Sequence, residues 1–277
     1  MKCRLLSLIL ACLMLSSFFV ACDVTPSETP KEGLAKGDYL YLGEYPQTAK
    51  AENVTLTDEV DERGYILGDD GAYYAMATAA PSNTSVKLSN GVTVFAGDVC
   101  YFKVEPIRWH VLRAKNGTAI LLCDTIIGNM AFSANGRNNY AESDIRAWLN
   151  NTFYQVAFTS HEKESIVRTE VDNSAVTTAD NRNNYTCPDT SDMVYLLCYA
   201  DFINADYGLT ETAQRKKLTT DLAKATGATN YWWMRSPYHY DYDNAWYVTT
   251  IGKLQYDQMS VTATRGGIVP VIQYKYE

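Results

Sequence analysis

The chain has little histidine and no run of basic residues. Three histidines occur among 277 residues, and the formal net charge is −8 at pH 7. An acidic chain without a basic stretch is a poor partner for nucleic acid or anionic lipid, both of which attract clustered Lys and Arg. We therefore expect no nucleic-acid ligand.

Motifs of the common catalytic and metal sites are also missing. No Cys-x-x-Cys pair or His/Cys cluster indicates a zinc or redox centre, and neither Gly-x-Ser-x-Gly nor His-Glu-x-x-His occurs. His110 follows Trp109 in an expected strand, with no nucleophile motif near it. Carboxylate pairs that meet only in the fold are not excluded by these absences. We expect a protein that is not an enzyme and requires no cofactor.

The N-terminus has the three parts of an export signal. Lys2 and Arg4 give a positive start, and an apolar run from Leu5 to Val20 follows. The run is shorter than the about 20 apolar residues that a membrane-spanning helix needs. A small residue then precedes Cys22, and the segment resembles the lipobox of bacterial lipoproteins. The alternative is an ordinary cleaved signal peptide with a cysteine at the junction.

The lipobox resemblance implies where the protein lies. Residues 1–21 would be removed, Cys22 would carry the lipid, and residues 22–37 would form a polar tether. Acyl chains contribute about 0.8 kcal/mol per buried methylene, so two or more chains anchor a protein stably. We expect a lipid-anchored, extracytoplasmic protein of the cell membrane or outer surface, with residues 38–277 as a single domain.

Cysteine and tyrosine usage leaves alternatives open. The four cysteines after Cys22 permit disulfides in an exported protein. Cys123 and Cys198 end apolar runs, however, and this placement favours buried free thiols. The 21 tyrosines suit either adaptable binding surfaces or the strands of a secreted β-rich domain.

Turn sequences predict several hairpins in the first half of the domain. Asp-Asp-Gly at 69–71 and Ser-Asn-Gly at 89–91 are flanked by strand-forming residues, so residues 48–98 are interpreted as a hairpin-rich insertion. A short strand is expected before them, at 38–43. The strongest hairpin joins residues 99–112 to 118–123 through an Asn-Gly turn.

Helical signals cluster in the middle of the chain. A helix is expected over 143–153 with Ser143 as its cap, and a second begins near Ser160 with Ile166 and Val167 on its buried side. A third helix is expected over 213–225, and residues 193–197 are interpreted as a strand. Strands return over residues 231–235, 245–250 and 266–276. Helices in the middle and strands at both ends indicate an α+β fold.

Four ordered landmarks carry a family resemblance. They lie at residues 103–112, 144–158, 232–237 and 267–271. In this order they resemble the bacterial domain of unknown function family 6273, over roughly residues 38–275. The family often has an arginine where this chain has Val269, so any role of that arginine is absent here.

That family in turn resembles the C-type-lectin-like fold in its sulfatase-modifying-factor version, to which formylglycine-generating enzymes belong. The resemblance implies one α+β domain with short helices and antiparallel sheets. Oxidase chemistry of that group needs a reactive cysteine pair near the C-terminus, and no cysteine follows Cys198. Fold alone carries no function.

In C-type-lectin-like folds, a loop between C-terminal strands faces the ligand. Here that loop is rich in Tyr and Asp, a composition able to stack on a glycan or grip a protein surface. Its Asp and Asn oxygens also suit calcium, although the loop could equally pack on Trp232 or Trp246. The candidate ligand-binding residues are Tyr238, His239, Tyr240, Asp241, Tyr242, Asp243, Asn244 and Trp233.

Other interpretations remain open. Two Asn-rich segments, residues 135–140 and 181–185, form a second binding candidate or simple loops. Arg235 is expected in a buried ion pair. The leading hypothesis is a lipoprotein that binds an external glycan or protein. The alternatives are a structural envelope protein without a ligand site, and a variable receptor diversified by a retroelement. An open groove at 238–244 would favour binding, and a collapsed loop the structural role.

Overall fold

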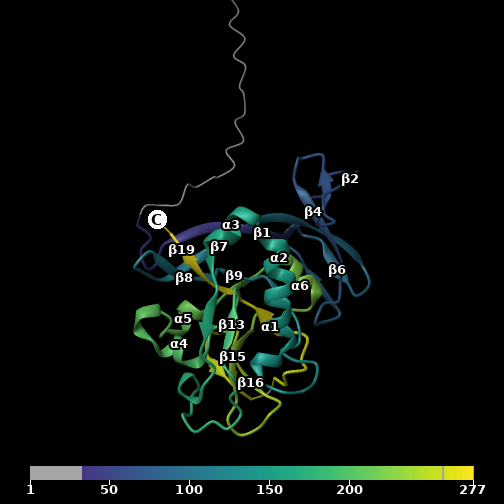
Figure 1. Cartoon of the computed structure of the whole chain (residues 1–277). Helices are drawn as coiled ribbons and strands as arrows, with labels where there is room; N and C mark the ends of the chain where they lie inside the picture. Colours follow the sequence, from purple (N-terminus) through teal and green to yellow (C-terminus); the bar gives the residue numbers. More distant parts are fainter. Residues whose placement is uncertain (1–32, 258, 277) are drawn as a thin grey trace, which may run out of the picture.

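The computed structural model describes residues 33–257 and 259–276. The predicted signal segment, Cys22 and most of the tether lie outside the described residues. The described chain is a mixed α/β structure with mainly antiparallel sheets and few short helices (Figure 1). None of the helices within it is long and apolar enough to cross a bilayer.

The larger sheet has eight strands and is organised around β7. Seven strands lie in one path, and β1 pairs with β7 off that path. All its pairings are antiparallel. In spatial order the path is β11 (Ile166–Val167), β19 (Val271–Lys275), β8 (Thr118–Cys123), β7 (Val99–Lys115), β4 (Tyr73–Thr78), β3 (Ile66–Gly68) and β2 (Leu56–Val60), with β1 at Tyr39–Ala49.

A second sheet of five strands carries the C-terminal part of the chain. It is antiparallel except where β15 and β18 run parallel. Its order is β10 (Gly128–Asn129), β18 (Gly267–Ile268), β15 (Trp232–Pro237), β16 (Ala245–Val248) and β17 (Leu254–Gln255). Three small pairs complete the strands: β12 (Thr169–Val171) with β13 (Thr190–Asp192), β5 (Ser85–Lys87) with β6 (Thr93–Phe95), and β9 (Thr125–Ile126) with β14 (Leu218–Thr219).

The predicted central hairpin is confirmed. Asn116 and Gly117 join β7 to β8 with φ angles of 53° and 72°. Two successive positive φ angles give a turn whose twist matches the flanking strands. The turns at 69–71 and 89–91 likewise close the hairpins β3–β4 and β5–β6.

The first strand is longer than expected. β1 continues beyond residue 43 to Ala49, with an irregularity in its pairing with β7 between Tyr41 and Glu44. Gly43 lies at that irregularity with φ 69°, and a Cβ there would meet the Ala157 carbonyl oxygen at 2.6 Å. Glycine lets the strand bend past the helical segment and resume its pairing.

The helices are short. Ser143 caps the first one as predicted, since its hydroxyl accepts a hydrogen bond from the Arg146 N–H. A π-helical turn at Leu149–Phe153 joins α1 to α2. The α-helices are α1 (Asp144–Trp148), α2 (Tyr154–Ala157), α3 (Ser160–Ser165), α4 (Tyr199–Ile203), α5 (Thr212–Arg215) and α6 (Asp221–Thr226).

Two of the helical predictions are wrong in extent. The helix expected over 213–225 is interrupted, because residues 218–219 pair with β9 and Thr220 caps the new helix α6 through the Ala223 N–H. Ile166 and Val167 do not continue α3. They form β11, where they hydrogen-bond with β19 at the edge of the large sheet.

The strand expected over 193–197 is also wrong. These residues are mostly buried, but Tyr195 makes only an isolated bridge to Val271. The Asn150 side chain takes the place of a neighbouring strand: its carbonyl oxygen accepts from the Met193 N–H at 2.8 Å, and its amide donates to the Val194 carbonyl at 2.9 Å. A side chain that hydrogen-bonds with these backbone groups replaces the neighbouring strand with which they would otherwise pair.

The core draws on both main sheets. Trp109 of β7 and Trp232 and Trp233 of β15 are among its largest fully buried side chains. Cys123 and Cys198 are buried free thiols, as expected from their apolar surroundings. A smaller cluster beneath residues 49–95 includes Ala225 of α6, so the hairpin region packs on that helix.

A buried carboxylate holds this region to α6. Asp221 accepts hydrogen bonds from the Ala49 N–H at 3.0 Å and the Ser89 N–H at 3.1 Å, and it also bonds to the Ser89 hydroxyl. Lys224 lies 3.2 Å from the same carboxylate, whose side chain is 3 % exposed. One side chain thus joins β1, the β5–β6 hairpin and α6.

We expect Asp221→Ala to destabilise the protein by about 3 kcal/mol, because two backbone N–H groups and a hydroxyl lose their acceptor in a buried place. Urea denaturation measures the loss. The exposed carboxylate of Asp58 on β2 provides a matched control, and Asp58→Ala should change stability by less than about 0.5 kcal/mol. Equal effects of the two substitutions would contradict this role of Asp221.

The same carboxylate makes stability depend on pH. Burial by itself raises the pKa of Asp221, but hydrogen bonds from Ser89 and Ala49 and the charge of Lys224 hold it below its usual value. Such a group contributes stability above its unfolded-state pKa, about 4, and loses it as the pH falls through the folded-state pKa. The stability difference between the native chain and Asp221→Ala should therefore stay constant from about pH 7 to 5 and shrink below about pH 4. A stability difference that stays the same below about pH 4 would contradict this role of the Asp221 carboxylate.

Candidate functional site

The loop of residues 238–244 connects β15 to β16. Figure 1 places these strands at the end of the molecule away from β1. The loop closes on itself where the Tyr238 N–H donates to the Asn244 carbonyl at 3.0 Å. The Asp243 carbonyl accepts from the Val261 N–H at 2.8 Å, which ties the loop to the following C-terminal segment. The loop is therefore fixed at its base and on one side.

A side chain from outside the loop holds its backbone from within. Asn138 is 2 % exposed, and its amide donates to the carbonyls of Asp241 at 2.9 Å and Asn244 at 2.8 Å. A longer contact of 3.4 Å reaches the Tyr238 carbonyl. The Asn138 backbone N–H donates to the Tyr242 carbonyl at 2.7 Å. One residue thus contacts four of the seven loop carbonyls.

Asn183 supports the start of the same loop. It is 5 % exposed, and its amide donates to the Pro237 carbonyl at 3.0 Å. Asn138 and Asn183 occupy the same place in two Arg-Asn-Asn-Tyr sequences, at residues 137–140 and 182–185. The two Asn-rich segments therefore act as scaffolds of the 238–244 loop through the first asparagine of each Arg-Asn-Asn-Tyr sequence.

The inner side of the loop packs on aromatic rings. Tyr238 stacks on Tyr256 with ring centroids 4.3 Å apart and planes at 10°. Tyr256 contacts Trp246 at 4.8 Å, and Trp246 contacts Tyr199 at 4.8 Å. Trp246 was one of the packing partners expected for this loop. Tyr199 and Tyr256 were missed, because neither is near the loop in a recognisable motif.

The outer side of the loop presents rings to solvent. Tyr240 is 75 % exposed and Tyr242 is 56 % exposed. The His239 ring lies 4.0 Å from that of Tyr240, and the Arg137 guanidinium lies 5.8 Å from the Tyr242 ring centroid. The loop is neither an open groove nor fully collapsed. It is an ordered ridge with two exposed aromatic faces.

One carboxylate oxygen of each loop aspartate is already engaged. Asp241 Oδ1 accepts from both the backbone N–H and the side-chain amide of Asn244, each at 3.1 Å. The same amide lies 3.0 Å from Asp243 Oδ1. Within the described residues, no group of three or more His, Cys, Asp or Glu side chains could hold a metal ion. The geometry gives no support to a calcium site here.

Trp233 does not share the loop surface. Its side chain is fully buried and its indole N–H donates to the Met130 carbonyl at 3.0 Å. Arg235 forms the expected buried ion pair, with Nη1 3.2 Å from Asp201 Oδ2 on α4. Despite the cost of burial, anionic and polar neighbours including Cys198 and Asp201 raise the pKa of Arg235, so it stays charged. Both residues stabilise the sheet beneath the loop.

Unpaired polar atoms concentrate at this end of the molecule. Of the five buried side-chain polar atoms without a hydrogen-bond partner among the described residues, Asn139 Oδ1, His239 Nδ1 and Trp246 Nε1 lie in the loop or beside its supports. An unpaired buried polar atom costs about 1–3 kcal/mol, so native proteins contain few of them. Their gathering here marks the loop as a candidate binding site.

No curated protein and no solved structure is significantly similar to the chain. The model of a family described as a domain of unknown function, DUF6273, matches residues 116–272, which is more than half of the chain. Three of the four sequence landmarks lie inside the match, and the landmark at 103–112 lies before it. The chain belongs to the domain of unknown function family DUF6273.

Proposed function

We propose that the protein is a lipid-anchored extracytoplasmic lipoprotein that binds a glycan through residues 238–244, without catalysis. The observation that carries this proposal is the ridge itself. Its backbone is clamped by buried Asn138, while the rings of Tyr240 and Tyr242 stay exposed. A flat aromatic face beside hydrogen-bonding groups suits the alternating apolar and hydroxyl surfaces of a sugar.

Pre-organisation makes such a surface effective. Ordering a flexible loop backbone on binding costs about 1–2 kcal/mol for each residue. Asn138 and Asn183 have already ordered this backbone in the free protein.

A C-type-lectin-like fold is part of the same proposal. Its support is coarse: a mixed α/β domain, antiparallel sheets with short helices, and a polar aromatic loop between two C-terminal strands. A loop in this place is the ligand-facing surface of such folds.

Replacing both exposed tyrosines should weaken glycan binding. We expect Tyr240→Ser with Tyr242→Ser to reduce binding on a glycan array by about 5- to 150-fold, since aromatic contacts of this kind contribute about 1–3 kcal/mol together. Tyr41→Ser removes a tyrosine that is 47 % exposed on β1 and serves as the matched control. Asn138→Ala should weaken binding too, because the rings stay while their backbone support is lost.

Two outcomes would decide against this function. If the native chain binds no glycan but the ridge captures a defined envelope protein, with loss in the double tyrosine variant, the ligand is a protein. If the native chain binds neither a glycan nor an envelope protein, the binding proposal is overturned and a structural envelope role remains.

The anchor is tested separately at Cys22. In a bacterial host fed labelled palmitate, the native chain should incorporate the label and sediment with membranes, because two or more acyl chains anchor stably. Cys22→Ala should lose both the label and the membrane association, whereas Cys100→Ala leaves both unchanged. Label retained by Cys22→Ala would contradict lipidation at this residue.

A further inference from the structure

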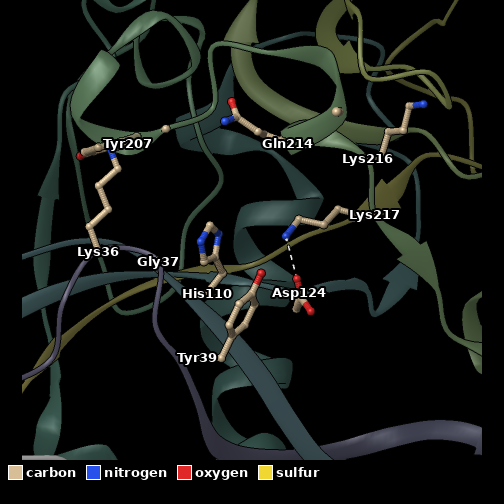
Figure 2. Close-up of a pocket in the computed structure, with 11 residues that line it drawn as sticks. Lys36, Gly37, Tyr39, His110, Asp124, Tyr207, Gln214, Lys216 and Lys217 are labelled. Atoms are coloured by element: carbon tan, nitrogen blue, oxygen red, sulfur yellow. Dashed lines mark hydrogen bonds and ion pairs between the residues drawn. The ribbon is translucent and has the colours of Figure 1, made fainter.

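A separate cavity of about 440 Å³ lies where the tether enters the domain. Lys36, Tyr39 and His110 form one side, and Asp124, Lys216 and Lys217 form the other (Figure 2). The Lys217 amino group is directed at Asp124, in a chain whose net charge is −8. The Lys36 amino group lies by Tyr207, where it donates to the Ala205 carbonyl at 3.0 Å, and that of Lys216 points away from the cavity (Figure 2). None of these residues belongs to the 238–244 ridge, so a ligand bound in this cavity is independent of the function proposed for the ridge.

Lys217 is the central cation of this cavity. Its side chain is 4 % exposed, and Figure 2 shows its amino group directed at Asp124, with Tyr39 and His110 close by. The Lys217 ammonium lies 3.4 Å from the Asp124 carboxylate. That same carboxylate also pairs with Arg108 at 3.2 Å. One anion is thus shared between two cations, and Lys217 lacks a full counter-charge.

The charges around His110 report a positive potential, whereas the pKa of Lys217 is lowered by its burial against the opposing effect of Asp124. Burial also lowers the pKa of His110, and the nearby charge of Lys217 lowers it further against the opposing effect of Asp124. A field that disfavours further positive charge favours an anion.

We propose that this cavity binds the phosphate group of a small phosphomonoester. Lysine ammonium groups act as point charges suited to phosphate, whereas carboxylates are typically held by the planar fork of arginine. A phosphomonoester carries a charge near −2 at pH 7, which matches the excess of Lys36, Arg108 and Lys217 over the single aspartate. The cavity volume also lies in the range of small-molecule sites.

The walls offer room for the organic part of the ligand. Tyr39 stacks on His110 with ring centroids 4.9 Å apart, and Arg108 covers the Tyr39 ring at 3.9 Å. A second hollow of about 540 Å³ shares Asp124 and Lys216 with the first. The phosphate would lie at Lys217, and the remainder of the molecule would extend along the aromatic wall toward this second hollow.

Calorimetry on the full chain in mild detergent tests the proposal, with glycerol 1-phosphate and inorganic phosphate as probes at low salt. We expect binding with Kd below about 1 mM. Lys217→Met should raise Kd at least about 10-fold, because a charge-assisted hydrogen bond is lost. Lys36→Met, at an exposed position, gives a second variant that keeps the buried Lys217–Asp124 pair. It should weaken binding several-fold.

Two controls separate this site from other effects. Lys253→Met removes an exposed lysine elsewhere and should leave Kd unchanged. The double variant at Tyr240 and Tyr242 should also bind phosphate normally, so failure at the ridge and failure at the cavity are distinguishable. In NMR titrations the ligand should raise the pKa of His110, because a bound dianion opposes the field of Lys217.

Vesicles distinguish the source of the phosphate. Phosphatidylcholine vesicles with and without phosphatidic acid present the same phosphomonoester as a lipid headgroup. Binding of glycerol 1-phosphate supports a soluble ligand. Binding only to phosphatidic acid vesicles, lost in Lys217→Met, supports a headgroup. Absence of binding in both arms, or binding that Lys217→Met and Lys36→Met leave unchanged, would overturn the proposal.

Discussion

The structure depends on the backbone pairing of β7. This 17-residue strand pairs with β1, β4 and β8, and so joins the N-terminal strand, the hairpin region and the central hairpin. Successive side chains of β7 point to opposite faces of the sheet, so this one strand has two roles. Ile107 and Trp109 are fully buried, whereas Arg108 and His110 project from the other face toward the basic cavity and its neighbouring hollow. The core and the cavity are therefore opposite sides of the same strand.

Local signals predicted the parts of the fold that depend on local chemistry. The Asn-Gly turn after β7 and the Ser143 cap were recognised because each needs only a few neighbouring residues. The predictions that failed depended on distant partners. Residues 193–197 were interpreted as a strand, but Asn150 pairs with their backbone instead, and residues 218–219 left their expected helix to pair with β9. Tertiary pairing overrode propensity in both places.

The same distinction between local signals and distant contacts applies to the two candidate sites. The composition of the 238–244 loop was visible in the sequence, but the hydrogen bonds from Asn138 and Asn183 were not, since about 55–105 residues separate these asparagines from the carbonyls they hold. The basic cavity left no sequence signal at all. Lys36, Arg108 and Lys217 come from three distant segments, so no basic run exists to be found.

The asparagine clamp also has a consequence for sequence variation. Asn138 and Asn183 hold backbone carbonyls of residues 237–244, a group that every amino acid possesses, and they contact no side chain of the ridge in doing so. At the outward positions 240 and 242, exchange of the side chain leaves these bonds available and alters only the exposed face. The fold thus separates the shape of its ridge from the chemistry displayed there, so a substitution at either of these two positions changes the displayed chemistry without rebuilding the domain.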